Sequence, residues 1–96
     1  QHIQKLEISA GTIIDFLLDK FVNAAISYDT EIEQNALDRR LMNIISQNYM
    51  SAYRHHSREK TKEKKLYLRL LLVTDYICGM TDTYAKTLYQ ELHGIS

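Results

Sequence analysis

The first strongly patterned segment runs from Thr12 to about Ser27. It contains ten apolar residues, whereas its polar residues Asp15, Asp19 and Asn23 recur every four positions. A four-residue recurrence places these three side chains on one narrow stripe of an α-helix. We therefore expect a helix that is apolar around most of its circumference and needs cover from neighbours on more than one side.

A second amphipathic helix is predicted from about Ala36 to Tyr53. The residues that share one face of it are Leu37, Leu41, Ile44, Ile45, Asn48, Tyr49 and Ala52. Between the two helices the apolar pattern breaks, and Thr30 with Glu33 three residues later fits a capping box. This break predicts a loop followed by a helix start.

The third predicted helix ends at Gly79, because glycine tolerates the left-handed backbone that closes many helices. Its apolar positions repeat at three- or four-residue steps at Leu66, Leu70, Val73 and Ile77, with Tyr67, Leu71 and Leu72 widening the face. The polar segment from His55 to Lys65 is either a connection or the exposed first turns of this helix.

A fourth helix is predicted after Gly79, with Thr81 and Asp82 as N-cap candidates. Its apolar positions are Tyr84, Ala85, Leu88, Tyr89 and Leu92. Gly94 fits a C′ position, and Ile95 fits the apolar contact of a Schellman ending. The chain has no proline and only three glycines, which favours long helices with few connections. The expected fold class is all-α, with about four helices in a bundle-like subdomain and no strand.

Length and composition limit the kinds of protein and partner that are compatible with this sequence. The 96 residues suit one domain or a piece of a larger protein, and 45% hydrophobic with 25% charged residues is an ordinary globular composition. Twelve basic and twelve acidic residues cancel, so no overall field favours nucleic acid or a membrane surface. No apolar run approaches the roughly 20 residues that span a bilayer, so no membrane partner is expected.

The chain begins at Gln1, without an initiator methionine or a signal peptide, which suggests that it was cut from something longer. Its one cysteine, Cys78, can form no disulfide within the chain. A reducing compartment, the cytoplasm, is therefore expected.

Two groups of residues invite a metal or catalytic interpretation, the pair Asp15 and Asp19 and the adjacent His55 and His56. A solvated stripe explains the aspartates, and neighbouring positions on a helix point about 100° apart, so the histidines do not converge on one ion. Cys78 lies near a predicted helix C-terminus, where the macrodipole disfavours a thiolate. We predict no catalytic residue, no metal site and no cofactor in this chain.

The segment from Arg54 to Arg69 is strongly basic. Its charged residues are Arg54, Arg58, Lys60, Lys62, Lys64, Lys65 and Arg69 against Glu59 and Glu63. Such a local field suits phosphate, and nearby tyrosines such as Tyr67 are typical of surfaces that bind single-stranded nucleic acid. The same charges are equally typical of a solvated helix end, so both interpretations stay open.

The last third of the chain carries a more specific motif, Asp75-Tyr76-Ile77-x-Gly79-Met80-Thr81-Asp82-x-Tyr84-Ala85. This motif resembles the C-terminal signature of bacterial deoxyguanosine triphosphate triphosphohydrolases, the dGTPases of the HD superfamily. The resemblance is strong over residues 66–94, and residues 12–56 look like the preceding helices of the same phosphohydrolase-associated region. The predicted structural signature comprises Asp75, Tyr76, Gly79, Met80, Thr81, Asp82 and Tyr84. Arg69 is the candidate substrate contact.

The resemblance implies a parent enzyme that hydrolyses dGTP, or several dNTPs, to deoxynucleoside and triphosphate. In that family a His/His-Asp/Asp set binds a divalent metal, Mg or Mn, that activates water or polarises phosphate. No His-Asp dipeptide occurs in this chain. Residues 1–96 are thus expected to be a single C-terminal helical domain, inactive alone, whose catalytic HD domain is absent.

The partners that the resemblance implies are the chain's own catalytic domain, further copies in a homo-oligomer, a dNTP in the parent, and single-stranded DNA. The expected roles are packing, oligomer assembly or support of the nucleotide site. The alternative is a free-standing helical adaptor that binds nucleic acid or protein through the basic Arg54–Arg69 surface.

Overall fold

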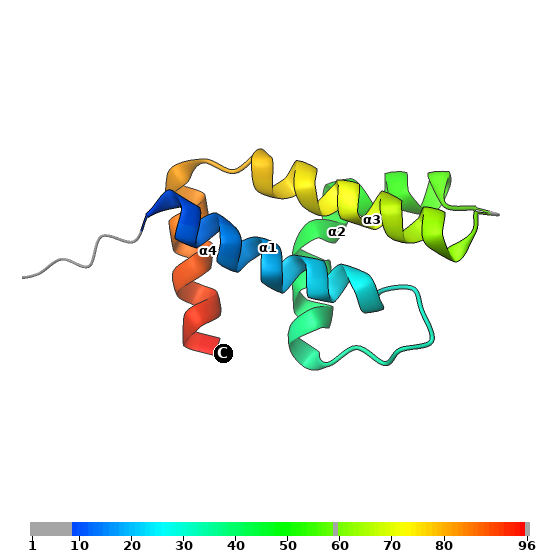
Figure 1. Cartoon of the computed structure of the whole chain (residues 1–96), viewed down its shortest axis with the longest axis horizontal. Coiled ribbons are helices and arrows are strands. Elements are labelled where there is room, and N and C mark those ends of the chain that lie inside the picture. The colour runs from blue at the N-terminus through cyan, green and yellow to red at the C-terminus, as the bar shows by residue number, and fades with distance from the viewer. Residues whose placement is uncertain (1–8, 59, 96) are drawn as a thin grey trace, which may run out of the picture.

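The computed structural model describes residues 9–58 and 60–95 and forms four α-helices in that part of the chain (Figure 1). They are α1 (Ala10–Ser27), α2 (Ala36–His56), α3 (Lys62–Cys78) and α4 (Asp82–Ile95). No strand occurs among these residues. The all-α class and the four predicted helices are confirmed.

Each of the four helices begins at a side chain that caps it. The oxygens of Ser9, Asn35, Thr61 and Thr81 accept hydrogen bonds from backbone N–H groups three residues further on, at 2.7 to 3.2 Å. Each such bond satisfies one of the N–H groups that have no partner within the helix. Thr81 is therefore the N-cap of α4, and Asp82 is its first residue.

The predicted capping box at Thr30 and Glu33 is wrong. The Thr30 hydroxyl donates to the carbonyl oxygen of Ser27 at 2.6 Å and accepts from the N–H of Ile32 at 3.1 Å, so it closes the turn after α1. Asn35 is the residue that caps α2. A short polar side chain bonds whichever backbone group lies nearest, and here that group belongs to the preceding helix.

Helix α1 is the centre of the fold, because α2, α3 and α4 all pack against it. Figure 1 shows α3 beside α1 and running in the opposite direction, while α4 lies across the first half of α1. The ring of Phe16 on α1 meets Tyr89 of α4 edge-on, with centroids 4.9 Å apart. The ring of Phe21 meets Tyr76 of α3 with centroids 5.5 Å apart. The expectation that this helix needs cover on several sides is confirmed.

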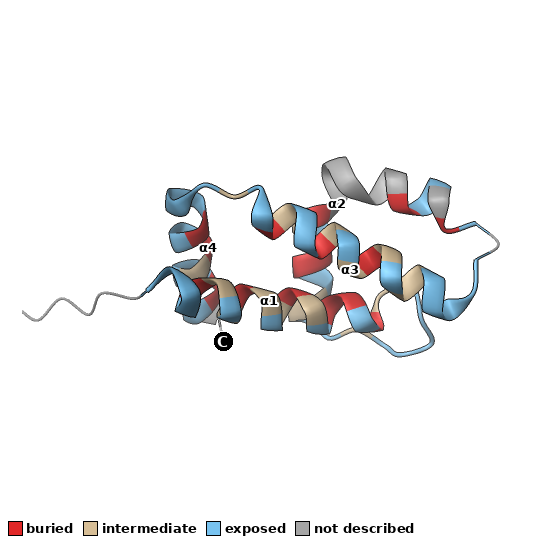
Figure 2. Cartoon of the chain, turned by 45° about the horizontal axis from the view of Figure 1, so that its top comes forward, coloured by how far each residue is buried: buried red, intermediate tan, exposed pale blue. Residues whose placement is uncertain are grey.

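The core collects the inner faces of all four helices (Figure 2). Its largest fully buried side chains are Phe21, Leu17, Leu41, Ile45 and Val73. The predicted polar stripe of α1, Asp15, Asp19 and Asn23, is exposed. Packing α1 between the others thus leaves only this stripe and the helix ends in water.

The apolar face predicted for α3 is partly wrong. Arg69, Val73 and Ile77 are its buried residues, whereas Tyr67 and Leu71 are exposed. Positions four apart share one side of a helix, so Arg69 lies on the inner face with Val73 and Ile77. On α2, Leu41 and Ile45 are buried as expected, while the side chains of Asn48, Tyr49 and Ala52 lie outside the described residues.

Gly79 ends α3 without the left-handed backbone expected for it. Its φ of −84° and ψ of −2° are right-handed, and its N–H bonds the carbonyl oxygen of Asp75 at 3.1 Å. A Cβ at this position would lie 3.2 Å from that same oxygen, so close approach, rather than handedness, favours glycine here. The Schellman ending predicted at Gly94 is wrong, because α4 continues through Gly94 to Ile95.

Candidate functional site

The signature motif forms the corner between α3 and α4. The hydroxyls of Tyr76 and Tyr84 lie 2.7 Å apart, and the Tyr76 ring also packs edge-on against Phe21 of α1. The two tyrosines therefore tie α3 and α4 together next to α1. Tyr84 keeps 45% of its surface exposed.

The other signature residues complete the same corner. Met80 is half-buried against the core, and Thr81 caps α4. Asp82 stands in the first turn of α4, where a carboxylate is favoured by the positive end of the helix dipole. Asp75 is exposed, and its carbonyl accepts the Gly79 N–H. These contacts are those of a tight helix–helix connection.

Arg69, the candidate substrate contact, is 3% exposed. Its Nε donates to the carbonyl oxygen of Ala25 at 2.6 Å, and its Nη2 donates to that of Ile26 at 3.4 Å. Its Nη1 donates to the hydroxyl of Tyr53 at 3.1 Å, and the guanidinium carbon lies 5.9 Å from that ring's centroid. The structure thus directs all three guanidinium nitrogens into the fold, and the contact of Arg69 with substrate stays a prediction.

Arg69 belongs to a set of groups that satisfies the C-terminal carbonyls of α1. The last four carbonyls of a helix have no partner within it. Here Ala24 accepts from the side chain of Gln34 at 2.9 Å and from the N–H of Tyr28, while Ser27 accepts from Thr30. The remaining two carbonyls, those of Ala25 and Ile26, accept from Arg69. The positive guanidinium also faces the negative end of the helix dipole.

Tyr53 links this set to the loop after α1. Its hydroxyl donates to the carboxylate of Asp29 at 2.9 Å while accepting from Arg69. Asp29 has a φ of 58°, a left-handed conformation that aspartate tolerates in turns. Burial raises the pKa of Tyr53, the Arg69 contact opposes that rise, and the Asp29 contact adds to it. Lys65 lies 3.9 Å from the Asp29 carboxylate at a half-exposed position.

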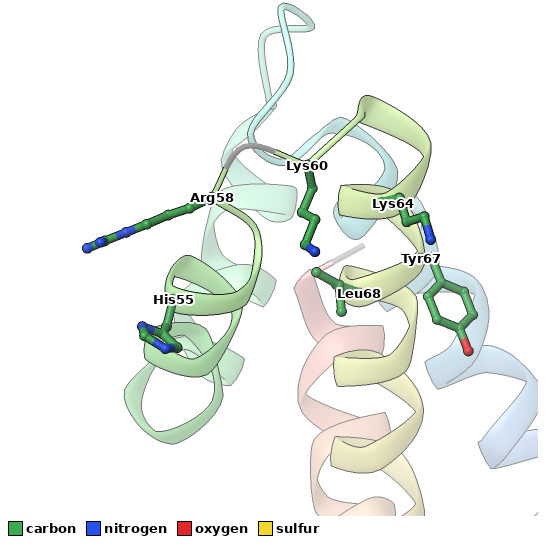
Figure 3. Close-up of a pocket in the computed structure, with 6 residues that line it drawn as sticks. All are labelled: His55, Arg58, Lys60, Lys64, Tyr67 and Leu68. Carbon is green, nitrogen blue, oxygen red and sulfur yellow. The ribbon is translucent and has the colours of Figure 1, made fainter.

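A cationic pocket lies where α2 ends and α3 begins. It is an open hollow of about 530 Å³, and its described lining residues are His55, Arg58, Lys60, Lys64, Tyr67 and Leu68. In Figure 3 the Lys60 side chain points toward Leu68, Lys64 and Tyr67 lie next to each other on α3, and Arg58 extends outward from the end of α2. The structure thus brings together part of the basic segment and separates it from Arg69.

The other candidates for chemistry are dispersed. Asp15, Asp19 and Cys78 are exposed on different parts of α1 and α3. Within the described residues, no three His, Cys, Asp or Glu side chains are placed to hold a metal ion. The side chains of His2 and His56 lie outside the described residues.

A family model, the phosphohydrolase-associated domain, matches residues 4–91. The chain belongs to this family. The match covers nearly the whole chain, including the signature corner and the Arg69 network. The resemblance inferred from the motif is therefore confirmed at the level of the family.

Relatives of this phosphohydrolase-associated domain are much longer proteins. The chain is 52% identical over 96 residues to a deoxyguanosinetriphosphate triphosphohydrolase-like protein of Listeria monocytogenes, covering 98% of this chain and 21% of that protein. It is 30% identical over 90 residues to one of Pseudomonas aeruginosa, covering 94% and 18%. It is 29% identical over 107 residues to a deoxyguanosinetriphosphate triphosphohydrolase of Yersinia enterocolitica, covering 95% and 21%. The chain spans about a fifth of the length of these relatives, and no solved structure matches it significantly.

No described helix of the phosphohydrolase-associated domain is long and apolar enough to cross a membrane. This agrees with the short apolar runs of the sequence.

Sequence reasoning missed the residues that fasten the C-terminal end of α1. From the sequence, Gln34 and Asp29 look like ordinary loop residues, and Tyr53 is one of several aromatic residues near the basic segment. One signal could have found part of the set: α1 has no basic residue in its last turn and no glycine after it. A helix ending of that kind needs donors from elsewhere.

Proposed function

We propose that this phosphohydrolase-associated domain is the non-catalytic C-terminal helical part of a dGTP triphosphohydrolase-like enzyme of the cytoplasm. The whole enzyme hydrolyses dGTP, or several dNTPs, to deoxynucleoside and triphosphate. A divalent metal, Mg²⁺ or Mn²⁺, acts in a catalytic domain outside these 96 residues. The observation that carries the proposal is 52% identity across 98% of the chain to a protein about five times as long.

The domain contributes packing and assembly to that enzyme. Its exposed large apolar side chains are Ile26, Ile32, Tyr67, Leu71 and Tyr84. Leu71 is 41% exposed in the middle of α3, on the side away from α1. Apolar surface of this kind is typical of contacts with another domain or subunit. The catalytic domain and a second copy of the enzyme are the proposed occupants.

A hydrolysis assay tests the catalytic part of the proposal. The full-length protein and the 96-residue chain are each incubated with dGTP and Mg²⁺ or Mn²⁺, and deoxyguanosine and triphosphate are measured. The full-length protein is expected to release both products in equal amounts, and the chain alone to release neither. Hydrolysis by the chain alone would contradict the proposal, as would a full-length protein inactive toward every dNTP.

A pair of variants tests the assembly part. Leu71→Glu in the full-length protein places a charge in the proposed contact, and Thr87→Glu adds the same charge at an exposed position of α4. Leu71→Glu is expected to weaken self-association or to reduce the hydrolysis rate by about tenfold, the scale of a contact worth about 1.4 kcal/mol, while Thr87→Glu changes neither. Equal behaviour of the two variants counts against a contact at Leu71.

A free-standing adaptor is the second candidate, and the exposed cations at the α2–α3 connection favour it. The two candidates differ in what the native gene encodes upstream. The enzyme requires a His-Asp pair within a helical domain there. If the gene encodes no such pair upstream, the enzyme proposal is excluded and the adaptor proposal remains.

A further inference from the structure

Helix α4 is attached to the rest of the fold differently from the other three helices. Helices α1, α2 and α3 each pack on the other two, whereas α4 packs mainly on α1. Figure 1 shows α4 across the first half of α1, at the end of the molecule opposite the α1–α2 loop. The buried hydrogen bonds that join α1, α2 and α3 run through Ala25, Tyr53 and Arg69, far from α4 in the chain. Moving α4 away therefore leaves these bonds intact.

The contact between α4 and α1 is apolar and aromatic. One face of α4 carries its buried residues, Ala85, Leu88 and Leu92. The neighbouring rings of Tyr89 and His93 meet the ring of Phe16 on α1, with centroids 4.9 and 4.5 Å away. A contact confined to one face of one terminal helix can open while the rest of a protein stays folded.

The connection between α3 and α4 has the features of a hinge. It consists of Gly79, Met80 and Thr81. The N–H groups of Gly79 and Met80 bond back to carbonyls of α3 at 3.1 and 3.2 Å, and the Thr81 side chain caps α4. Hinges are commonly a few residues at helix ends, and glycine adopts more backbone conformations than other residues. The hydrogen bond between the Tyr76 and Tyr84 hydroxyls, which spans this connection, is exposed, so water can replace it.

We propose that α4 is a hinged arm that opens at residues 79–81 while α1, α2 and α3 stay folded together. An isolated helix of 14 residues is marginal in water, so the open arm loses its helical hydrogen bonds. Opening also uncovers the Phe16 ring on α1. The signature motif then has a mechanical role, because it forms the hinge, and its Tyr76–Tyr84 hydrogen bond favours the closed arm. This role is independent of dGTP hydrolysis.

Native-state hydrogen exchange of the ¹⁵N-labelled 96-residue chain, followed by NMR at urea concentrations below the unfolding transition, tests this proposal. The amides of α4 are expected to have protection factors at least about tenfold lower than those of α3. Their exchange is also expected to depend less on urea, because opening α4 exposes less surface than global unfolding does. Equal protection and equal urea dependence in the two helices would overturn the proposal.

Two matched substitutions separate a hinged arm from a single cooperative unit. Leu41→Ala on α2 and Leu88→Ala on α4 remove the same atoms from buried positions. Leu41 stays packed whether the arm is open or closed, so Leu41→Ala is expected to accelerate exchange in α3 by about thirtyfold or more while α4 stays within about threefold of the parent. Leu88→Ala destabilises only the closed form and is expected to accelerate exchange in α4 by about thirtyfold or more. The proposal is overturned if Leu41→Ala accelerates exchange in α4 as much as in α3.

A milder pair serves if circular dichroism shows that either Leu→Ala variant is unfolded. Ile45→Val on α2 is expected to accelerate exchange in α3 about fivefold and to leave α4 unchanged. Tyr84→Phe removes the exposed hydroxyl at the hinge and is expected to accelerate exchange in α4 about threefold. Parallel acceleration of both helices by Ile45→Val, or no effect of Tyr84→Phe on α4, contradicts a hinged arm.

Discussion

Arg69 and the lysine pair Lys60 and Lys64 lie within ten residues of each other, yet they occupy opposite environments. Arg69 is buried and donates to two carbonyls of α1 and to Tyr53. Lys60, in the connection before α3, and Lys64, in the first turn of α3, are exposed and line the pocket. The number of basic residues in a segment therefore says little about its function until the fold shows which of them are buried and which are exposed.

The comparison also shows what a buried charge requires. A guanidinium out of water needs partners for its N–H groups, and the end of α1 supplies carbonyls that equally need donors. Because each group satisfies the other, Arg69 closes α1 from a position 44 residues further along the chain. The exposed lysines have water as a partner.

The largest expected effect is on the buried side of the comparison. Arg69→Met keeps most of the side-chain volume but leaves the carbonyls of Ala25 and Ile26 without these donors. A buried acceptor that loses its partner costs about 1–3 kcal/mol, so the free energy of unfolding is expected to fall by about 2–4 kcal/mol in urea titrations. Lys64→Met, the same change on the exposed side, is the control. Equal losses in the two variants would erase the distinction between the two faces.

Tyr53→Phe is expected to have the next largest effect. It removes the hydroxyl that joins Asp29 to Arg69, and a hydrogen bond to a charged group contributes about 1.5–3 kcal/mol. The measurement is again the free energy of unfolding. Tyr28→Phe, at a half-buried ring that meets Tyr53 edge-on, is the matched control and should cost less. If Tyr53→Phe has the same free energy of unfolding as the parent chain, Arg69 holds the end of α1 without the Tyr53 hydroxyl.

The pH dependence of the same residue sharpens the comparison. Burial raises the pKa of Tyr53 above the ordinary value near 10, so folding favours the neutral hydroxyl. The stability that this group contributes is fully present below about pH 10 and is lost as pH rises through the raised pKa. Tyr53→Phe is therefore expected to flatten the alkaline decline of the unfolding free energy. An identical decline in both proteins contradicts this account.

A smaller effect on stability is expected when the N-cap side chain of a helix is removed. Asn35→Ala removes the cap of α2 and should cost about 1 kcal/mol, measured by thermal unfolding. Asn23→Ala, at an exposed position inside α1, controls for the loss of an asparagine and should be neutral or slightly stabilising. If Asn35→Ala costs nothing, the start of α2 is fixed by packing of Leu41 and Ile45 instead.

The smallest effect on stability is expected in the pocket itself. Lys60→Gln/Lys64→Gln should change the free energy of unfolding by less than about 0.5 kcal/mol, because neither side chain has a partner among the described residues and exposed charges contribute little. Far larger destabilisation would mean that these lysines serve the fold, as Arg69 does.

The helices were predictable from the sequence because their apolar periodicity is strong and their ends are polar. The polar stripe of α1, the buried Leu41 and Ile45, and the Thr81 cap all follow local rules of three- and four-residue spacing. The family followed from a motif whose residues are consecutive. Each of these features is local in the chain.

The features that could not be predicted from the sequence depend on contacts between residues that are far apart in the chain or on backbone geometry. The sequence does not show whether Arg69 faces α1 or solvent. Apolar residues such as Tyr67 and Leu71 lie on the other side of α3, so the apolar pattern does not identify the side that packs against α1. Thr30, Gln34 and Arg69 satisfy the same helix end from very different sequence distances, and no spacing rule connects them. The left-handed turn predicted at Gly79 is wrong because the sequence does not distinguish a glycine that needs a positive φ from a glycine that allows close approach of another atom.

The division between Arg69 and the pocket lysines is the central claim, and a single NMR titration tests both halves of it. The chain, labelled with ¹⁵N, is titrated with a dT oligonucleotide of about twelve nucleotides, and the backbone amides and the Arg69 Nε–H signal are followed together. The account predicts that the amides of Lys60, Lys64 and Tyr67 shift while the Arg69 Nε–H signal stays in place. A large shift of the Arg69 signal with silent lysines would contradict it.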